Sequence, residues 1–331
     1  MSGRSGYRFA DKDMRQRMRA LLAHRLAPVV WAAAIALLLP PFFPSAYYFR
    51  IGALVFIFAL AVVGLNLLMG FAGQVSLGHA GFVGIGAYAA AIGPAHLGIP
   101  SWLCVVVGAA LAGVVAYLVG KPILRLKGHY LAVATLGFGL LVSIVLTNEA
   151  GWTGGPDGMS VARLRVLGQA VYGSQTWYWI AAATFCIGAA LALNLIDSPT
   201  GRVLQAIHDS ETAARALGVD VARSKLAIFV ISAVYASVSG SYLALLNGHV
   251  TPDLAGFLRS IELVAMVVLG GMGSIFGSLV GAAVLVVLPQ TLTAIHEYEH
   301  MALGLIVMGC MIFLRRGIVP ALATALAGRL K

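Results

Sequence analysis

The chain is divided into long apolar runs, each about as long as a bilayer is thick. A helix that crosses the hydrocarbon core of a bilayer needs about 20 mostly apolar residues. The runs that approach this length are 27–44, 51–69, 75–93, 101–120, 129–147, 177–196, 226–246 and 301–314. Charged residues make up only 10% of the chain, against about 25% in a soluble domain. The sequence therefore predicts an all-α polytopic membrane protein, a helix bundle of about eight to ten transmembrane segments.

A further apolar run, 261–288, is too long for one simple span and is interrupted near its centre. As one helix, this run would extend about 42 Å, against a hydrocarbon core of about 30 Å. The interruption is Gly270-Gly271-Met272-Gly273-Ser274, and glycine is unfavourable inside a helix. We therefore expect two short segments or a re-entrant pair, so that the Gly-rich helices of the bundle are broken or re-entrant.

The basic residues indicate which ends of the runs face the cytoplasm. With both termini in the cytoplasm, the segments on that side hold 18 of the 22 Lys and Arg residues, as the positive-inside rule requires. This topology predicts a basic cytoplasmic arm over 1–26, a transmembrane domain over 27–318 and a cytoplasmic tail over 319–331. A cytoplasmic loop spans 197–225, and an outer loop spans 148–176. Because the outer loop is too short for a receptor domain, we expect another protein to capture the substrate.

Polar side chains gather in one apolar stretch, 66–88, where a lipid-facing helix would not carry them. They alternate with glycines and are Asn66, Gln74, Ser76, His79 and Tyr88. Irregular backbone at membrane depth occurs only where it is buried in protein or lines a cavity. We therefore expect this stretch to face the bundle interior. Its polar groups either hydrogen-bond neighbouring helices or line a substrate path.

The second Gly-rich break is weakly similar to the first. Both 73–76 and 271–274 begin with glycine and end with serine, as pseudo-repeat elements of a transporter would. Ser274 is therefore assigned to the candidate substrate path together with Asn66, Gln74, Ser76, His79 and Tyr88. His79 alone does not make a proton relay, because no acidic residue occurs in the apolar runs before Glu149.

The cytoplasmic loop contains a helix-forming segment between two apolar runs. Pro199 and Gly201 end the preceding run, and 203–217 is rich in helix formers. Gly218 stands where a helix C-terminus favours glycine. Asp209 or Ser210 can equally cap a second short helix, which would make the loop a helix-turn-helix.

The side chains of this segment predict two faces. The apolar residues that could share one stripe are Leu204, Ile207, Ala214 and Leu217. The charged residues available for ion pairs are Arg202, Asp209, Glu211 and Arg215. An amphipathic segment of this kind either docks a cytoplasmic partner or rests, solvated, on lipid headgroups.

Several other classes of function are disfavoured. The only Gly-Lys pair is followed by Pro122, so no P-loop for ATP is expected, and neither an enzyme nor a cofactor site is predicted. Cys104, Cys186 and Cys310 lie singly in apolar runs, which favours neither a metal site nor a disulfide. The basic residues lie between the apolar runs rather than on one soluble face, so nucleic acid is not an expected partner. Active transport must then draw its energy from another subunit or from an ion gradient.

Four blocks of the sequence together resemble a known family. They are 64–88 (GLNLLMGFAGQVSLGHAGFVGIGAY), 153–158 (TGGPDG), 201–225 (GRVLQAIHDSETAARALGVDVARSK) and 267–283 (VVLGGMGSIFGSLVGAA). They look like the LivM-type inner-membrane permeases of branched-chain amino acid ABC importers. Matching blocks run from about Gly52 to Leu314, so the resemblance covers nearly the whole chain.

The resemblance implies a multi-pass permease of the bacterial inner membrane that moves amino acids of the branched-chain type. The implied partners are a second permease of the LivH type, two cytoplasmic ATPase subunits that bind ATP-Mg, and a periplasmic solute-binding protein. The residues implied in docking the ATPase are Arg202, Leu204, Ile207, Asp209, Glu211, Arg215, Leu217 and Gly218. The general pattern of ABC permeases has Glu-Ala-Ala at this point, and Thr212 departs from it directly after Glu211.

A function of a different class is a stand-alone channel or secondary carrier for a small polar solute such as urea or an amide. A secondary carrier usually has charged groups deep in its spans for ion coupling. The clearly assigned span interiors of this chain contain none. A channel needs no coupling loop, so deletion of 211–217 would leave the flux of a channel intact and abolish ATP-driven uptake by a permease.

Overall fold

The computed structural model describes residues 27–126, 128–166, 169–291 and 317–321, together with Gly304, Met308 and Gly309. The predicted basic arm, nearly all of the apolar run 301–314 and most of the tail lie outside the described residues. The long helices are α2 (Ala27–Leu38), α3 (Ala46–Asn66), α4 (His79–His96), α5 (Ser101–Ile123), α6 (His129–Asn148), α8 (Ser174–Asp197), α11 (Val221–Asn247), α12 (Phe257–Gly270) and α13 (Ile275–Thr291).

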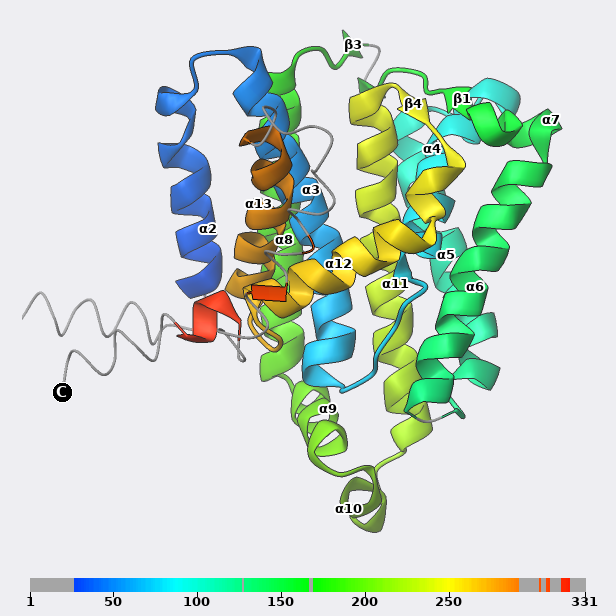
Figure 1. Cartoon of the computed structure of the whole chain (residues 1–331), viewed down its shortest axis with the longest axis vertical. Helices are drawn as coiled ribbons and strands as arrows, with labels where there is room; N and C mark the ends of the chain where they lie inside the picture. The colour runs from blue at the N-terminus through cyan, green and yellow to red at the C-terminus, as the bar shows by residue number, and fades with distance from the viewer. Residues whose placement is uncertain are drawn as a thin grey trace, which may run out of the picture.

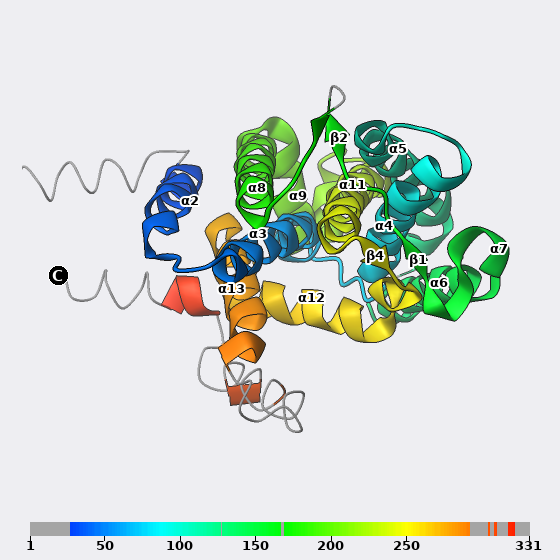
Figure 2. The ribbon, with the colours of Figure 1, turned by 90° about the horizontal axis from the view of Figure 1, so that it is seen from above.

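The described helices form a bundle suited to a membrane (Figure 1). Five described helices are long and apolar enough to cross a membrane: α3 with its extension to Phe71, α5, α6, α8 and α11. Two shorter apolar helices are Pro28–Leu38 and Ile275–Gln290. In α3, 83% of the apolar window is buried, against 17% in α6. Therefore α3 lies in the core and α6 at the periphery, as the view from above also shows (Figure 2). The prediction of an all-α polytopic membrane protein is confirmed.

Helices α4 and α11 pack so closely that their small residues are required. A Cβ atom on Gly240 would lie 1.9 Å from the carbonyl oxygen of Val83, and one on Gly86 would lie 1.9 Å from that of Ser237. Ser241 Oγ donates to the carbonyl oxygen of Gly86 at 2.9 Å. Small residues of this kind let helices approach within hydrogen-bonding distance inside a membrane. The contact fixes α4 against the centre of the bundle.

Two helices are interrupted inside the bundle. After α3 the chain makes a π-helical turn, η2 (Leu67–Phe71), and α4 does not begin until His79. The prediction of one span over 75–93 was therefore wrong at its start, because Gly73 takes a positive φ of 65° and the chain is not helical over 74–78. The predicted division of 261–288 is confirmed: α12 ends at Gly270 and α13 begins at Ile275. Figure 1 shows α12 lying across the bundle.

The outer loop predicted over 148–176 folds back onto the segment that follows α11. It contains α7 (Ala150–Thr153), the 3-10 turn η3 (Gly155–Asp157) and the strands β1 (Met159–Ser160), β2 (Arg165–Val166) and β3 (Gln169–Ala170). Strand β1 pairs antiparallel with β4 (His249–Val250), β2 pairs with β3, and the 3-10 turn η4 (Pro252–Ala255) leads into α12. The opposite end of the bundle carries a hairpin of α9 (Pro199–Asp209) and α10 (Glu211–Ala216), which projects beyond the other helices (Figure 1).

Candidate functional site

The polar stretch that follows α3 lies inside the bundle, as predicted. Asn66, Gln74, Ser76, His79 and Tyr88 are each at most 2% exposed. The non-helical part of this stretch is held by neighbouring helices. Leu77 N–H donates to Thr135 Oγ1 of α6 at 3.1 Å, and Ala80 N–H donates to Ser260 Oγ of α12 at 3.1 Å. Irregular backbone is thus enclosed by protein, which is the condition for its survival at membrane depth.

Asn66 joins the two interrupted regions. Its Oδ1 accepts from Gly273 N–H at 2.8 Å, and its Nδ2 donates to the carbonyl oxygen of Ser274 at 2.9 Å and to Ser278 Oγ at 3.0 Å. Ser274 Oγ accepts from Gly277 N–H at 3.0 Å, at the start of α13. The structure therefore brings these two candidate path residues together, and it uses both to hold the break between α12 and α13.

His79 is tied to the central helix α11. Its Nε2 lies 3.2 Å from the carbonyl oxygen of Ser232 and 3.0 Å from Ser232 Oγ. Ser232 Oγ in turn donates to the carbonyl oxygen of Gly64 at 2.7 Å. These contacts connect α3, α4 and α11 at the point where α4 begins. One nitrogen of His79 therefore has a structural role, and no acidic partner for it is among the described residues.

Several buried polar atoms near this stretch have no hydrogen-bond partner among the residues that the structure describes. They are Gln74 Oε1 and Nε2, Ser76 Oγ, His79 Nδ1, Tyr88 Oη and Ser237 Oγ. Buried polar groups are nearly always paired, and leaving one unpaired costs about 1–3 kcal/mol. A set of such atoms on α4, α11 and the segment before α4 is therefore suited to a polar solute or water. The set offers neutral donors and acceptors.

The projecting hairpin is defined by caps at each of its helix ends. Ser198 Oγ accepts from Gly201 N–H at the start of α9, and Ser210 Oγ accepts from Ala213 N–H at the start of α10. Of the two arrangements that the sequence left open, the structure has the helix-turn-helix, with Ser210 rather than Asp209 as the cap of α10. At the end of α10, Gly218 has a φ of 83°. Its N–H donates to the carbonyl oxygen of Arg215, and Val219 N–H donates to that of Ala214, which is the Schellman arrangement expected for a C-terminal glycine.

The apolar residues of the hairpin do not share one face. Leu204, Ile207 and Ala214 are buried, and Ile207 and Ala214 pack against Val221. Leu217, predicted to join them, is 82% exposed. The reason is that α10 ends at Ala216, so Leu217 already belongs to the turn and does not follow the helical spacing. The hairpin therefore presents one large apolar side chain outward.

Glu211 is used inside the chain. Its carboxylate forms ion pairs with Lys225 at the start of α11 and with Arg215, the latter at 3.3 Å. Lys225 is only 7% exposed, and its pairing anchors α10 to α11. The other two charged candidates lie on the surface of α9: Arg202 is exposed, and Asp209 Oδ1 lies 3.8 Å from His208 Nδ1.

Helix α9 contacts the first interrupted region and shares a cavity with the second. A Cβ atom on Gly73 would lie 3.0 Å from His208 Cδ2. A cavity of about 330 Å³ is lined by Gly70, Phe71, Gln205, His208, Asp209 and Gly273. Residues of α9 thus line one cavity with both the π-helical turn and the break before α13. Movement of α9 would therefore alter the cavity beside both the π-helical turn and the break before α13.

Comparison with known proteins assigns the chain to a family. The family described as "Branched-chain amino acid transport system / permease component" matches residues 47–315. This match begins at the second residue of α3 and spans every later described helix through α13, including the buried polar stretch and the hairpin. The chain belongs to this permease family.

Individual relatives of this permease agree with the assignment. The LivM permease protein of the high-affinity branched-chain amino acid transport system of Escherichia coli K12 is 33% identical over 304 residues, which cover 85% of this chain and 72% of the relative. The LivH permease protein of Salmonella typhimurium LT2 is 29% identical over 69% of this chain and 79% of its own length. The ribose import permease RbsC of Haemophilus influenzae is 24% identical over 86% of this chain and 89% of its own length. No solved structure matches the chain.

Three residues of the permease that matter at this site were not identified from the sequence. Ser232 and Ser237 lie on α11, where small residues recur at helical spacing, and that recurrence is a usable signal for a tightly packed central helix. His208 carries no such signal, because its contact with Gly73 depends on how the hairpin folds under the bundle.

Proposed function

We propose that this permease is the transmembrane subunit of an ABC importer that moves amino acids of the branched-chain type across the bacterial inner membrane. Separate ATPase subunits, which bind ATP-Mg, supply the energy. A periplasmic solute-binding protein delivers the substrate, and a LivH-type permease completes the pathway. Both relatives of highest identity reported above are permease proteins of a branched-chain amino acid transport system, which supports this substrate class.

The α9–α10 hairpin is the observation that carries the proposal. It projects from one end of the bundle (Figure 1), exposes Leu217, and contacts Gly73 through His208. A short, rigidly capped element of this kind fits a groove on a partner protein. In the proposed topology, which follows the positive-inside rule, this end is cytoplasmic. An ATPase docked there would act directly on the two interrupted regions.

The mechanism follows from the contacts of α9. Closure of the ATPase pair on ATP shifts the hairpin, and His208 transmits this shift to Gly73 and to the π-helical turn just before it, which contains Gly70. Asn66 connects that turn to Gly273, so both breaks move together. Access to the polar atoms of Gln74, Ser76 and Tyr88 then changes from the outer to the inner side. A thousandfold uphill gradient costs only about 4 kcal/mol, so the required work is modest.

The test is uptake of radiolabelled leucine by proteoliposomes that hold this chain with its LivH-type partner and ATPase subunits. Uptake is measured with and without ATP and with and without the binding protein. We expect uptake to require both. Leucine flux through this chain alone, indifferent to ATP, would overturn the proposal in favour of a channel or carrier.

A matched pair of variants tests the docking surface. Leu217→Asp places a charge on the exposed tip of the hairpin, and we expect it to reduce uptake at least tenfold, equivalent to about 1.4 kcal/mol, and to prevent co-purification of the ATPase. Leu97→Asp is the control, because Leu97 is also well exposed and follows α4, outside the hairpin. Equal losses in both variants would show that the hairpin tip is not the docking surface.

A further inference from the structure

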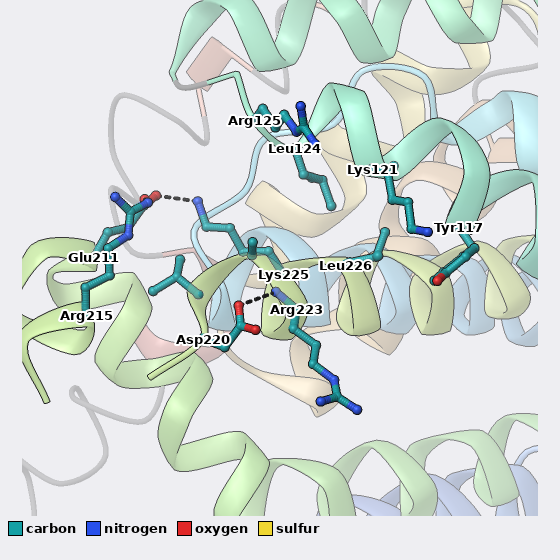
Figure 3. A pocket seen from close by; sticks show the side chains of 13 residues that line it. Tyr117, Lys121, Leu124, Arg125, Glu211, Arg215, Asp220, Arg223, Lys225 and Leu226 are labelled. Atoms are coloured by element: carbon teal, nitrogen blue, oxygen red, sulfur yellow. Dashed lines mark hydrogen bonds and ion pairs between the residues drawn. The ribbon is translucent and has the colours of Figure 1, made fainter. Parts of the chain in front are cut away.

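A basic cleft lies beside the hairpin and is separate from the proposed substrate path. Its volume is about 880 Å³, and it is bounded by the C-terminal end of α5, by α10 and by the start of α11. Figure 3 shows Lys121 and Arg125 of the α5 end, Glu211 and Arg215 of α10, and the side chains of the α11 start around this space.

The charges that line the cleft are mostly positive. The basic side chains are Lys121, Arg125, Arg215, Arg223 and Lys225, and the carboxylates are Glu211 and Asp220. Both carboxylates are engaged within the chain: Glu211 pairs with Lys225 and Arg215, and Asp220 Oδ1 accepts from Arg223 N–H at 3.0 Å. An excess of positive charge therefore remains for an anion. Lys121 Nζ lies 4.2 Å from the centre of the Tyr117 ring, at the edge of this space.

The surface of α5 above the cleft indicates which anion fits. Exposed apolar side chains recur at helical spacing along one face of α5, at Val107, Leu111, Val114 and Leu118. Lys121 continues the same spacing, and Arg125 follows just beyond the end of the helix. From Val107 to Leu118 the face rises about 16 Å, which is about half of the 30 Å hydrocarbon core. An acyl chain of one leaflet has this length.

We propose that the cleft binds the headgroup of an anionic phospholipid, with Lys121 and Arg125 contacting its phosphate and an acyl chain lying along the exposed face of α5. Basic pockets between transmembrane helices at the membrane surface are suited to such headgroups. A soluble anion would gain nothing from the apolar face, and a docked protein would not need its alignment with the cations. The inference does not depend on the substrate or on the ATPase.

A bound lipid would connect three elements of the chain. The headgroup would lie between the end of α5, the side chains of α10 and the first turn of α11. It would therefore help to hold the hairpin against the bundle. The lipid composition of the membrane would then affect how firmly the hairpin is positioned.

The experiment is a native mass spectrometry titration of the purified full-length chain with phosphatidylglycerol and, separately, with phosphatidylcholine. One basic contact near a lipid surface is worth about fivefold in affinity. We expect Lys121→Gln with Arg125→Gln to weaken phosphatidylglycerol binding about 25-fold and to leave phosphatidylcholine binding unchanged. The control is Arg50→Gln with Arg163→Gln, which removes two positive charges that lie outside the cleft. This control should still bind phosphatidylglycerol in preference to phosphatidylcholine. Lys121→Arg with Arg125→Lys should also retain this preference.

Four results would overturn the inference. The first is an unchanged preference for phosphatidylglycerol in the Lys121→Gln, Arg125→Gln variant, and the second is an equal loss in the Arg50→Gln, Arg163→Gln control. The third is complete displacement of the lipid by excess inorganic phosphate with no preference for phosphatidylglycerol over phosphatidylcholine, which would assign the cleft to a free anion. If the variant retains lipid but no longer co-purifies with the ATPase, the cleft belongs to the protein interface instead.

Discussion

The side-chain amide of Asn66 accepts a hydrogen bond from Gly273 N–H at 2.8 Å, across 207 positions of sequence. This bond connects the last residue of α3 to the break between α12 and α13. Because the π-helical turn begins directly after Asn66, the two interrupted regions are mechanically joined. Asn66 is therefore a structural link between the two interrupted regions, and its place on the substrate path stays a prediction.

Removing this link should destabilise the chain. Asn66→Ala leaves Gly273 N–H and the carbonyl oxygen of Ser274 without their buried partner, and we expect a loss of about 1–3 kcal/mol in the free energy of unfolding. The measurement is a denaturant titration of the purified chain in mixed micelles. Asn194→Ala is the control, because Asn194 is exposed on α8 and should change stability by less than about 0.5 kcal/mol. Equal effects of the two substitutions would contradict the linking role.

Gly73 provides a test of transmission from the hairpin. Alanine at position 73 would have to adopt a positive φ, which costs about 1–2 kcal/mol of strain. Its Cβ atom would also lie 3.0 Å from His208 Cδ2. Gly98→Ala is closely matched, because Gly98 has a φ of 64° and no atom within 4 Å of its Cβ position. We expect similar losses of stability in both variants.

The two variants should differ in coupling. Gly73→Ala displaces His208 and should lower the number of substrate molecules imported per ATP hydrolysed, while Gly98→Ala should not. The measurement is uptake and ATP hydrolysis in the same proteoliposomes. Identical ratios in both variants would show that the contact between His208 and Gly73 does not transmit the movement.

The pair of Glu211 and Lys225 should stabilise the position of α10. Glu211→Gln leaves the ammonium of Lys225, which is only 7% exposed, without its carboxylate, and we expect a loss of about 1–3 kcal/mol. Adding Lys225→Met removes the stranded charge and should recover part of that loss, which a double-mutant cycle measures. Arg215→Gln breaks the more exposed pair and should cost less than about 1 kcal/mol. A cycle with no coupling energy would contradict the anchoring role.

Local signals in the sequence were sufficient where local chemistry decides the structure. The break at Gly271 and Gly273 was predicted because glycine is unfavourable in a helix, and both residues adopt positive φ values. The end of α10 near Gly218 was predicted because glycine is favoured just after the C-terminus of a helix. Ser210 was one of two possible caps, and the choice between them depends on where the turn of the hairpin lies.

Contacts between distant segments could not be predicted in this way. The late start of α4 at His79 depends on hydrogen bonds from Leu77 and Ala80 to helices α6 and α12. The exposure of Leu217 depends on the turn that follows α10, which helical spacing ignores. The burial of Lys225 beside Glu211 needs the hairpin to fold back on α11. The start of α4 and the burial of Lys225 arise from tertiary packing, whereas Leu217 is exposed because α10 ends before it. None of the three leaves a periodic pattern in the sequence.

Substitution of Gln74 tests whether the polar stretch lines a substrate path or has only a structural role. Its Oε1 and Nε2 are buried and have no hydrogen-bond partner within the described part of the chain, so Gln74→Ala removes no internal hydrogen bond there. We therefore expect it to change the free energy of unfolding by less than about 1 kcal/mol. If Gln74 contacts the solute in transit, the loss of one hydrogen bond of about 1.4 kcal/mol should lower the uptake rate about tenfold.

The measurement is the initial rate of leucine uptake at saturating binding protein, together with the affinity of the binding protein for leucine. That affinity should not change, because the binding protein is a separate molecule. Gln175→Ala, at an exposed position near the start of α8, is the matched control and should leave the uptake rate unchanged. An unchanged rate in Gln74→Ala would place Gln74 among the residues that only fill the bundle. A lower rate with unchanged stability and an unchanged ratio of uptake to ATP hydrolysis would place Gln74 on the substrate path.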